Sequence, residues 1–115
     1  MAAGAVIGLL AFARPGQAHA RLVSAAPAPN TEVAAPRAVL LTFSEPIVQR
    51  FSGFELSKTD ASANAIAVKA ALSGPKMLVG DLPGPLARGV YRVAWHAVAN
   101  DDGHRTSGAF VFKVH

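Results

Sequence analysis

The chain has 115 residues, enough for one domain with a short extension, and it contains no cysteine. Without a thiol, disulfides, iron–sulfur clusters, cysteine-ligated zinc fingers and cysteine nucleophiles are excluded, as is a blue-copper site, whose short equatorial bond is to a thiolate. The formal net charge is +4, and the lysines and arginines are scattered along the chain and form no basic stripe. We therefore expect no nucleic-acid partner.

The chain opens with an apolar, uncharged segment over residues 2–13, which is shorter than the roughly 20 residues that cross a hydrocarbon layer. It fits the apolar core of a secretory signal, although the basic segment that normally precedes such a core is missing. The run RPGQA at 14–18 then breaks any helix and places small residues at 16 and 18, as a signal peptidase requires. We expect residues 1–18 to be removed on export and residues 19–115 to form a periplasmic, or otherwise extracytoplasmic, domain.

Cleavage after Ala18 would leave His19 as the first residue. A competing site of the same small-x-small form, Ala18-His19-Ala20, would remove that histidine. A third interpretation is an apolar N-terminal helix that stays attached. Spacing does not decide among the three.

From Arg21 onward, short apolar runs alternate with clusters of Pro, Gly, Asn, Asp and Ser, which is typical of a β protein. The eight prolines between these runs argue against long helices. We expect strands at Leu22 to Ala26, Val39 to Phe43, Phe54 to Leu56, Ala65 to Val68, Met77 to Val79, Val90 to Val98 and Ala109 to Val114.

Two of these runs alternate clearly between an apolar and a more polar face. In Val90 to Val98 one face holds Tyr91, Val93, Trp95 and Ala97, and in the last run Phe110, Phe112 and Val114 share one side. About seven short strands predict an all-β fold, an antiparallel Greek-key sandwich or small barrel of the immunoglobulin-like or cupredoxin-like kind.

The residues best suited to bind a ligand form the cluster Asn100-Asp101-Asp102-Gly103-His104, between the two clearest strands. A polar turn accounts for Asn100, Asp101 and Gly103 but not for a histidine at the start of the next strand. If the backbone is extended there, Asp102 and His104 project to the same side and bring a carboxylate and an imidazole together, as in half of a metal site.

A mature N-terminal His19 would complete this site. Its α-amine and Nδ1 close a six-membered chelate ring on one metal ion, and the amine has an ordinary pKa near 7.7–8.0, so deprotonation is easy at neutral pH. With Asp102 and His104 the set becomes three nitrogens and one oxygen. Cu(II) prefers tetragonal N,O coordination and heads the divalent affinity order, so we expect a single type-2-like Cu(II) site and not a zinc site.

The remaining candidate residues are weaker. Glu45, where a strand ends at Pro46, is either a solvated carboxylate or an acceptor that orients a ligand imidazole. His96 falls on the Arg92 face of its strand and is interpreted as a surface residue, and His115 is the last residue. Met77 is expected to fill the core; with so few methionines, a methionine-rich Cu(I) site is not expected.

No serine-nucleophile elbow, phosphate-binding glycine loop or HExxH motif is present, and we expect the chain not to be an enzyme. All four expected ligands come from the protein, which favours a copper carrier or buffer. Two alternatives stay open: a copper monooxygenase-like enzyme with a terminal-histidine site, and a metal-free β-sandwich interaction module.

Taken together, these residues make the chain resemble the CopC-type periplasmic copper-binding proteins of copper resistance, over about residues 19–114. The motifs that carry the resemblance are the post-signal His19-Ala20, Ser24-Ala25-Ala26-Pro27 with Pro29-Asn30, Leu41-Thr42-Phe43-Ser44-Glu45-Pro46, Gly89-Val90-Tyr91-Arg92-Val93-Ala94-Trp95, and Asp102-Gly103-His104-Arg105-Thr106-Ser107-Gly108-Ala109-Phe110-Val111-Phe112.

The resemblance implies a seven-stranded β-sandwich or barrel that binds Cu(II) through His19, Asp102 and His104, with Glu45 as the acidic residue near the site. It implies a role in copper homeostasis and a CopD-like inner-membrane copper transporter as partner. We expect a monomer. The chain lacks the methionine-rich loop of the two-site members of this family.

Overall fold

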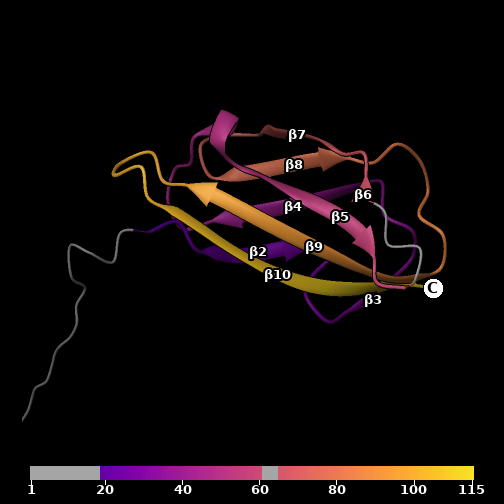
Figure 1. The fold of residues 1–115 in the computed structure, drawn as a ribbon. Helices are drawn as coiled ribbons and strands as arrows, with labels where there is room; N and C mark the ends of the chain where they lie inside the picture. Colours follow the sequence, from indigo (N-terminus) through magenta and orange to yellow (C-terminus); the bar gives the residue numbers. More distant parts are fainter. Residues whose placement is uncertain (1–18, 61–64) are drawn as a thin grey trace, which may run out of the picture.

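The computed structural model describes residues 19–60 and 65–115, so the expected leader at 1–18 lies outside the described residues. The described chain folds into two β-sheets packed face to face (Figure 1). The strands are β2 (Leu22–Ala26), β3 (Glu32–Val33), β4 (Ala38–Phe43), β5 (Gly53–Lys58), β6 (Ala65–Ile66), β7 (Lys69–Leu72), β8 (Met77–Asp81), β9 (Gly89–Val98) and β10 (Arg105–Val114), with one 3-10 turn, η3 (Gln49–Phe51).

One sheet has five strands in the order β3-β10-β9-β5-β6, and the other has four in the order β2-β4-β8-β7. The predicted all-β sandwich is confirmed, with the strands in two separate sheets. Pairing is antiparallel except between β3 and β10, which run parallel.

Two strands were not predicted, and one was predicted too long. β3 has only two residues, too few to show a period, and β7 reads Lys-Ala-Ala-Leu, whose lysine and alanines are poor strand formers. The run expected at Ala65 to Val68 pairs only over Ala65–Ile66. The pairing of these short edge strands is set by the neighbouring strands and not by local sequence preference. The periodicity of their own residues therefore did not predict them.

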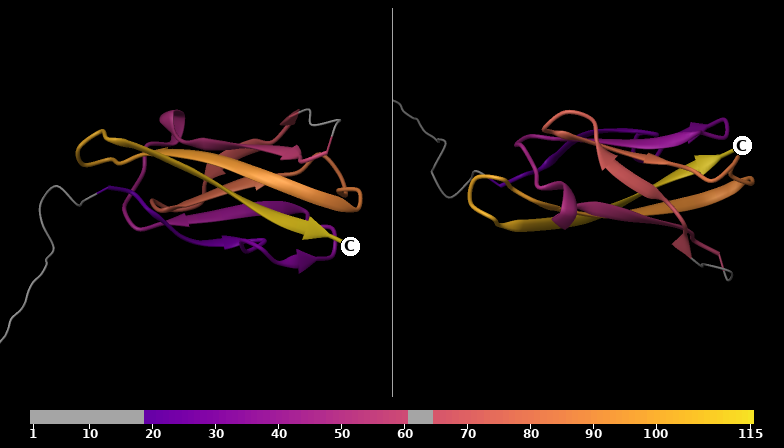
Figure 2. Two further views of the ribbon diagram at one scale, coloured as in Figure 1. Left: turned by 60° about the horizontal axis from the view of Figure 1, so that its bottom comes forward. Right: turned by 90° about the horizontal axis from the view of Figure 1, so that it is seen from above.

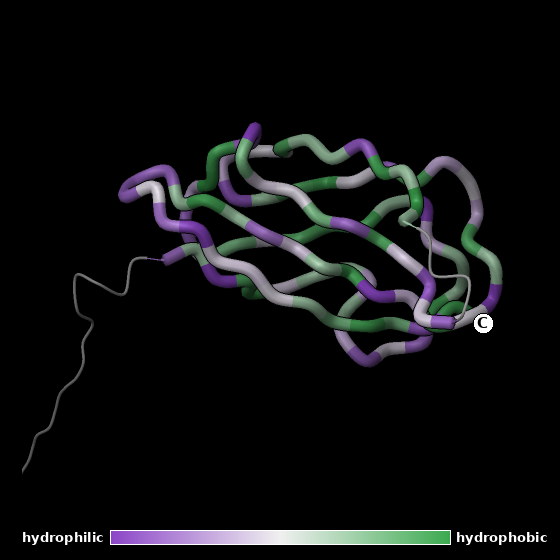
Figure 3. Tube along the Cα trace, in the orientation of Figure 1, coloured by the Kyte–Doolittle hydropathy of each residue, from purple (hydrophilic) through white to green (hydrophobic). Residues whose placement is uncertain are grey.

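The core lies between the sheets and follows the predicted alternation. Tyr91, Val93 and Ala97 of β9 are buried, as are Phe112 and Val114 of β10. Green and purple segments accordingly alternate along the strands in Figure 3. Burying an aliphatic or aromatic side chain contributes roughly 1.5–3 kcal/mol each, so these inward rows hold the two sheets together.

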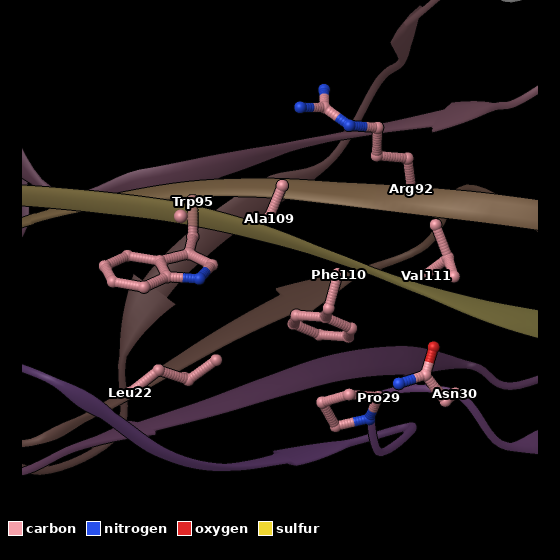
Figure 4. Close-up of a pocket in the computed structure, with 9 residues that line it drawn as sticks. Leu22, Pro29, Asn30, Arg92, Trp95, Ala109, Phe110 and Val111 are labelled. Atoms are coloured by element: carbon pink, nitrogen blue, oxygen red, sulfur yellow. The ribbon is translucent and has the colours of Figure 1, made fainter.

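Trp95 is half-buried near the margin of the sandwich, where its ring packs edge-on against Phe43 at a centroid distance of 5.4 Å. Figure 4 shows Trp95 and Phe110 pointing from the five-stranded sheet toward Leu22 of the other sheet. Gly108 leaves room for the indole, because a Cβ there would lie 2.7 Å from Cζ2 of Trp95. A side chain at position 108 would therefore displace the ring.

The first described residues, 19–21, and the β9–β10 turn lie at the same end of the sandwich, opposite the C-terminus (Figures 1 and 2). The connection that follows β4 reaches the same end, where Ile47 forms a β-bridge with Ala99. Three segments far apart in sequence thus meet at one end. Among the described residues, no helix has the length and hydropathy that a membrane crossing requires.

Candidate metal centre

The β9–β10 turn is closed by its own backbone. The N–H of Ala99 donates to the carbonyl of His104 at 3.0 Å, and the N–H of Gly103 donates to the carbonyl of Ala99 at 3.0 Å. Gly103 has φ +71°, a left-handed conformation that glycine adopts without strain. Asn100 anchors the turn to the β4 connection by donating its N–H to the Pro46 carbonyl at 2.9 Å.

Asp102 and His104 converge, as predicted, but for a different reason. The expectation of an extended backbone is wrong, because Asp102 lies in the turn and the left-handed Gly103 separates it from β10. Oδ1 of Asp102 accepts the N–H of His104 at 3.0 Å, and its Oδ2 lies 3.2 Å from Nδ1 of the imidazole. Turn geometry, and not strand alternation, brings the two groups together.

His19 joins this pair from the other end of the chain. Its Nε2 lies 3.0 Å from Nδ1 of His104, and the two rings meet edge-on with centroids 4.8 Å apart. One ligand atom each from His19, Asp102 and His104 fall within 4.8 Å of one another. The structure therefore brings together all three residues that the sequence singled out as metal ligands.

Two hydroxyl groups hold the backbone beside His19. Ser44 Oγ donates to the His19 carbonyl at 3.3 Å and accepts the N–H of Arg21 at 2.9 Å. Thr106 Oγ1 donates to the carbonyl of Ala20 at 2.6 Å, and Ala20 is fully buried. Sequence reasoning missed both roles, although each hydroxyl residue lies within two positions of a candidate, Glu45 or His104.

The charge state of the cluster suits a cation. The backbone N–H of His104 lowers the pKa of Asp102 below its usual value, with a further lowering from the two nearby imidazoles. Asp102 is therefore ionised throughout the range in which histidines titrate. The site is open to solvent, since 64% of the His104 side chain is exposed.

Two imidazoles and one carboxylate form a nitrogen-rich set without sulfur, suited to Cu(II) and to other divalent transition metals. Nothing else in the described residues groups three such donors. The sequence family described as the CopC domain matches residues 22–115 of this chain.

The chain belongs to the CopC family. The matched range begins after His19, so it includes Asp102 and His104 but not His19. A CopC-family relative, copper resistance protein C of Pseudomonas syringae pv. tomato, is 43% identical over 98% of this chain and 90% of its own length. Protein YobA of Escherichia coli K12 is 37% identical over 84% of this chain and 79% of its own length.

Solved CopC-family structures share the fold. The crystal structure of PcoC, a methionine-rich copper resistance protein from Escherichia coli, superposes with a TM-score of 0.79 at 38% identity, covering 85% of this chain and all of PcoC. CopC from Methylosinus trichosporium OB3b gives a TM-score of 0.72 at 29% identity, covering 84% and 93% of the two chains. The named relatives are copper resistance proteins or carry neutral names, and none is named as an enzyme.

Among the described residues, the other sequence candidates in this CopC-family chain are not part of this cluster. Glu45 is half-buried, and among the described residues it makes no hydrogen bond or ion pair with either imidazole. His96 lies on the outer face of β9, and the N–H of His115 donates to the Val33 carbonyl. Met77 is half-buried at the start of β8.

Proposed function

We propose that this CopC-family chain is a periplasmic copper carrier or buffer in copper homeostasis, which binds a single Cu(II) ion at His19, Asp102 and His104. The observation that carries the proposal is the convergence of these three donors within 4.8 Å, although His19 is 83 positions from Asp102 and 85 from His104 in the sequence. A nitrogen-rich set with one carboxylate is what Cu(II) prefers.

The proposal includes removal of residues 1–18, so that His19 contributes its α-amine as a fourth donor. In the full chain the backbone nitrogen of residue 19 is a peptide amide, a poor ligand at neutral pH. The ring nitrogen facing His104 is Nε2, whereas a chelate with the amine uses Nδ1. Cleavage before His19 would allow the ring to turn about its side-chain bonds and close that chelate.

A carrier role follows from the exposure of the site. The His104 imidazole is mostly accessible to solvent, so incoming ligands can reach the ion without the sandwich opening. We propose a CopD-like inner-membrane copper transporter as the exchange partner, and a monomer as the working form. Glu45 would orient one of the ligand imidazoles once the metal is bound.

Intact-mass measurement of the secreted protein, followed by Cu(II) titration, tests the proposal. The chain starting at His19 should bind one Cu(II) with a tetragonal, nitrogen-rich EPR spectrum. The same chain with Ala18 retained, and the variant His19→Ala, should bind at least tenfold more weakly, because one or both arms of the chelate are lost. Equal binding by the processed and extended chains would show that the amine is not a ligand.

A further inference from the structure

The outer face of the five-stranded sheet is uncovered in the part of the chain that the structure describes, and it adjoins the metal cluster. On this face Ser107 of β10 lies opposite His96 of β9, and Ala109 lies opposite Ala94. Glu55 of β5 lies on the other side of Ala94. The small side chains of Ala94 and Ala109 leave a shallow depression of about 610 Å³.

Two guanidinium groups border this depression. Arg92 and Arg105 line it together with His96, and both arginines are exposed. Figure 4 shows Arg92 projecting to the side of the sheet opposite Trp95 and Phe110. Within residues 19–60 and 65–115, the ion pairs are Lys58 with Asp60 and His104 with Asp102, so neither arginine is neutralised by a salt bridge.

A second depression continues the same face toward the metal cluster. It is lined by Phe51, His96, Gly103 and Arg105, among others, and so reaches the turn that carries His104. Phe51 is 52% exposed, and the guanidinium of Arg50 lies 5.0 Å from its ring centroid. An exposed aromatic ring with arginines around it is typical of the residues that dominate protein–protein binding.

We propose that this surface, formed by Arg50, Phe51, Arg92, His96 and Arg105 and called here the sheet-face patch, docks an acidic segment of the protein with which the chain exchanges copper. The copper exchange rests on the proposed function; the docking of an acidic segment does not. A partner that takes or gives the ion must bring its ligands to the turn at Asp102–His104, and the sheet-face patch is the surface beside that turn.

Charge complementarity favours an acidic peptide as the ligand of the sheet-face patch. The unpaired arginines offer planar, bidentate donors to carboxylates. A uniformly charged membrane surface fits less well, because Glu55 borders the same depression and Asp101 lies in the adjacent turn. A peptide can place its carboxylates over the arginines and an apolar side chain on Phe51 while avoiding these two acids.

The test uses the copper-free chain from His19 and a capped peptide, acetyl-Glu-Glu-Leu-Glu-Glu-amide, with acetyl-Gln-Gln-Leu-Gln-Gln-amide as the uncharged control. Amide NMR shifts should change around Phe51, Arg92 and Arg105 with the acidic peptide only. The double variant R92Q/R105Q should bind at least about fivefold more weakly, and binding should fall with salt. Arg88→Gln, at an exposed arginine just before β9, is the matched control and should bind like the unchanged chain.

Equal binding by R92Q/R105Q and by the unchanged chain would overturn the proposal, as would shift changes confined to other surfaces. Binding to phosphatidylglycerol vesicles through the same residues, without binding to the acidic peptide, would overturn it in favour of a membrane surface. Because the peptide-binding experiment contains no copper, its outcome does not depend on whether the proposed function is correct.

A second experiment measures the rate of copper exchange. Acceptors Gly-Gly-His-Glu-Glu-Leu-Glu-Glu and Gly-Gly-His-Gln-Gln-Leu-Gln-Gln bind Cu(II) at the same N-terminal motif and differ only in charge. At low salt the loaded chain should transfer Cu(II) about tenfold faster to the acidic acceptor, and R92Q/R105Q should abolish the difference. If the chain bound no copper, the proposed function would fail while the peptide-binding result remained.

Discussion

Nε2 of His19 lies 3.0 Å from Nδ1 of His104, although the two residues are 85 positions apart in the sequence. No local preference creates such a contact. It depends on Ser44 and Thr106, whose hydroxyls hold the backbone of residues 19–21 against the β4 connection and the start of β10. The geometry of the candidate site is thus a property of the folded sandwich as a whole, and substitutions outside the three candidate residues can perturb it.

Thr106→Val should weaken Cu(II) binding about five- to tenfold while leaving the protein folded. The substitution keeps the shape of the side chain but removes the hydrogen bond to the buried Ala20 carbonyl, a loss of roughly 1–3 kcal/mol. Part of that free energy appears as lower affinity, because the N-terminal segment must be ordered for His19 to reach the ion. Cu(II) titration and urea unfolding of the same samples measure the two parts.

Thr59→Val is the control for this experiment, since Thr59 is exposed and remote from the cluster, on the connection after β5. It should leave the copper affinity unchanged. If Thr106→Val and Thr59→Val bound copper equally well, the hydroxyl of Thr106 would have no part in positioning His19.

The three residues of the candidate site could be singled out because each carries a chemical signature in the sequence. His19 follows a small-residue cleavage motif, and the pair Asp102 and His104 lies in a polar turn between two strongly alternating strands. The reasons for their convergence were less accessible. A left-handed Gly103 and an aspartate that accepts its neighbour's N–H are tertiary details of a turn, and the extended geometry assumed from the sequence is wrong there.

The hydroxyl contacts of Ser44 and Thr106 show a different limit. Serine and threonine are common in strands and turns, so neither residue type predicts a long-range hydrogen bond to a backbone carbonyl. Their role becomes visible only when three separate segments are placed together. The short edge strands β3 and β7 escaped prediction for the same reason, because neighbouring strands impose their pairing.

The pH dependence of copper binding should come from the nitrogen donors and not from Asp102. The His104 N–H and the two imidazoles lower the pKa of Asp102, so this carboxylate is ionised above the ordinary aspartate range and takes up no proton near pH 6. Asp102→Asn should therefore reduce affinity while leaving the slope of log Kd against pH unchanged between pH 5.5 and 7. His104→Ala should reduce the affinity across this pH range, because one nitrogen donor is lost. A change of slope in Asp102→Asn would contradict this assignment.

His96 should make the copper-free protein less stable as the pH falls. Burial against the sheet, and then the charge of Arg105, lower the pKa of His96 in the folded state, with a smaller opposing effect from Glu55. The favourable contribution of the neutral ring is complete above the unfolded pKa of about 6.5 and is lost as the pH falls through the lower folded pKa. Urea unfolding at pH 7.5 and 5.0 should show a smaller loss of stability for His96→Gln than for the unchanged chain. An equal loss in both proteins would exclude His96 as a source of the pH dependence.

Gly108→Ala should destabilise the fold by about 1–3 kcal/mol and disturb the environment of Trp95. The added Cβ would lie 2.7 Å from Cζ2 of the indole, so either the ring, which packs edge-on against Phe43, or the strand must shift. Gly84→Ala is the matched control, because a Cβ there meets no atom within 4 Å. Urea unfolding gives the free energies, and tryptophan fluorescence reports the ring. Equal stability and equal spectra for the two variants would mean that the sandwich margin around Trp95 is loosely packed and that position 108 does not require glycine.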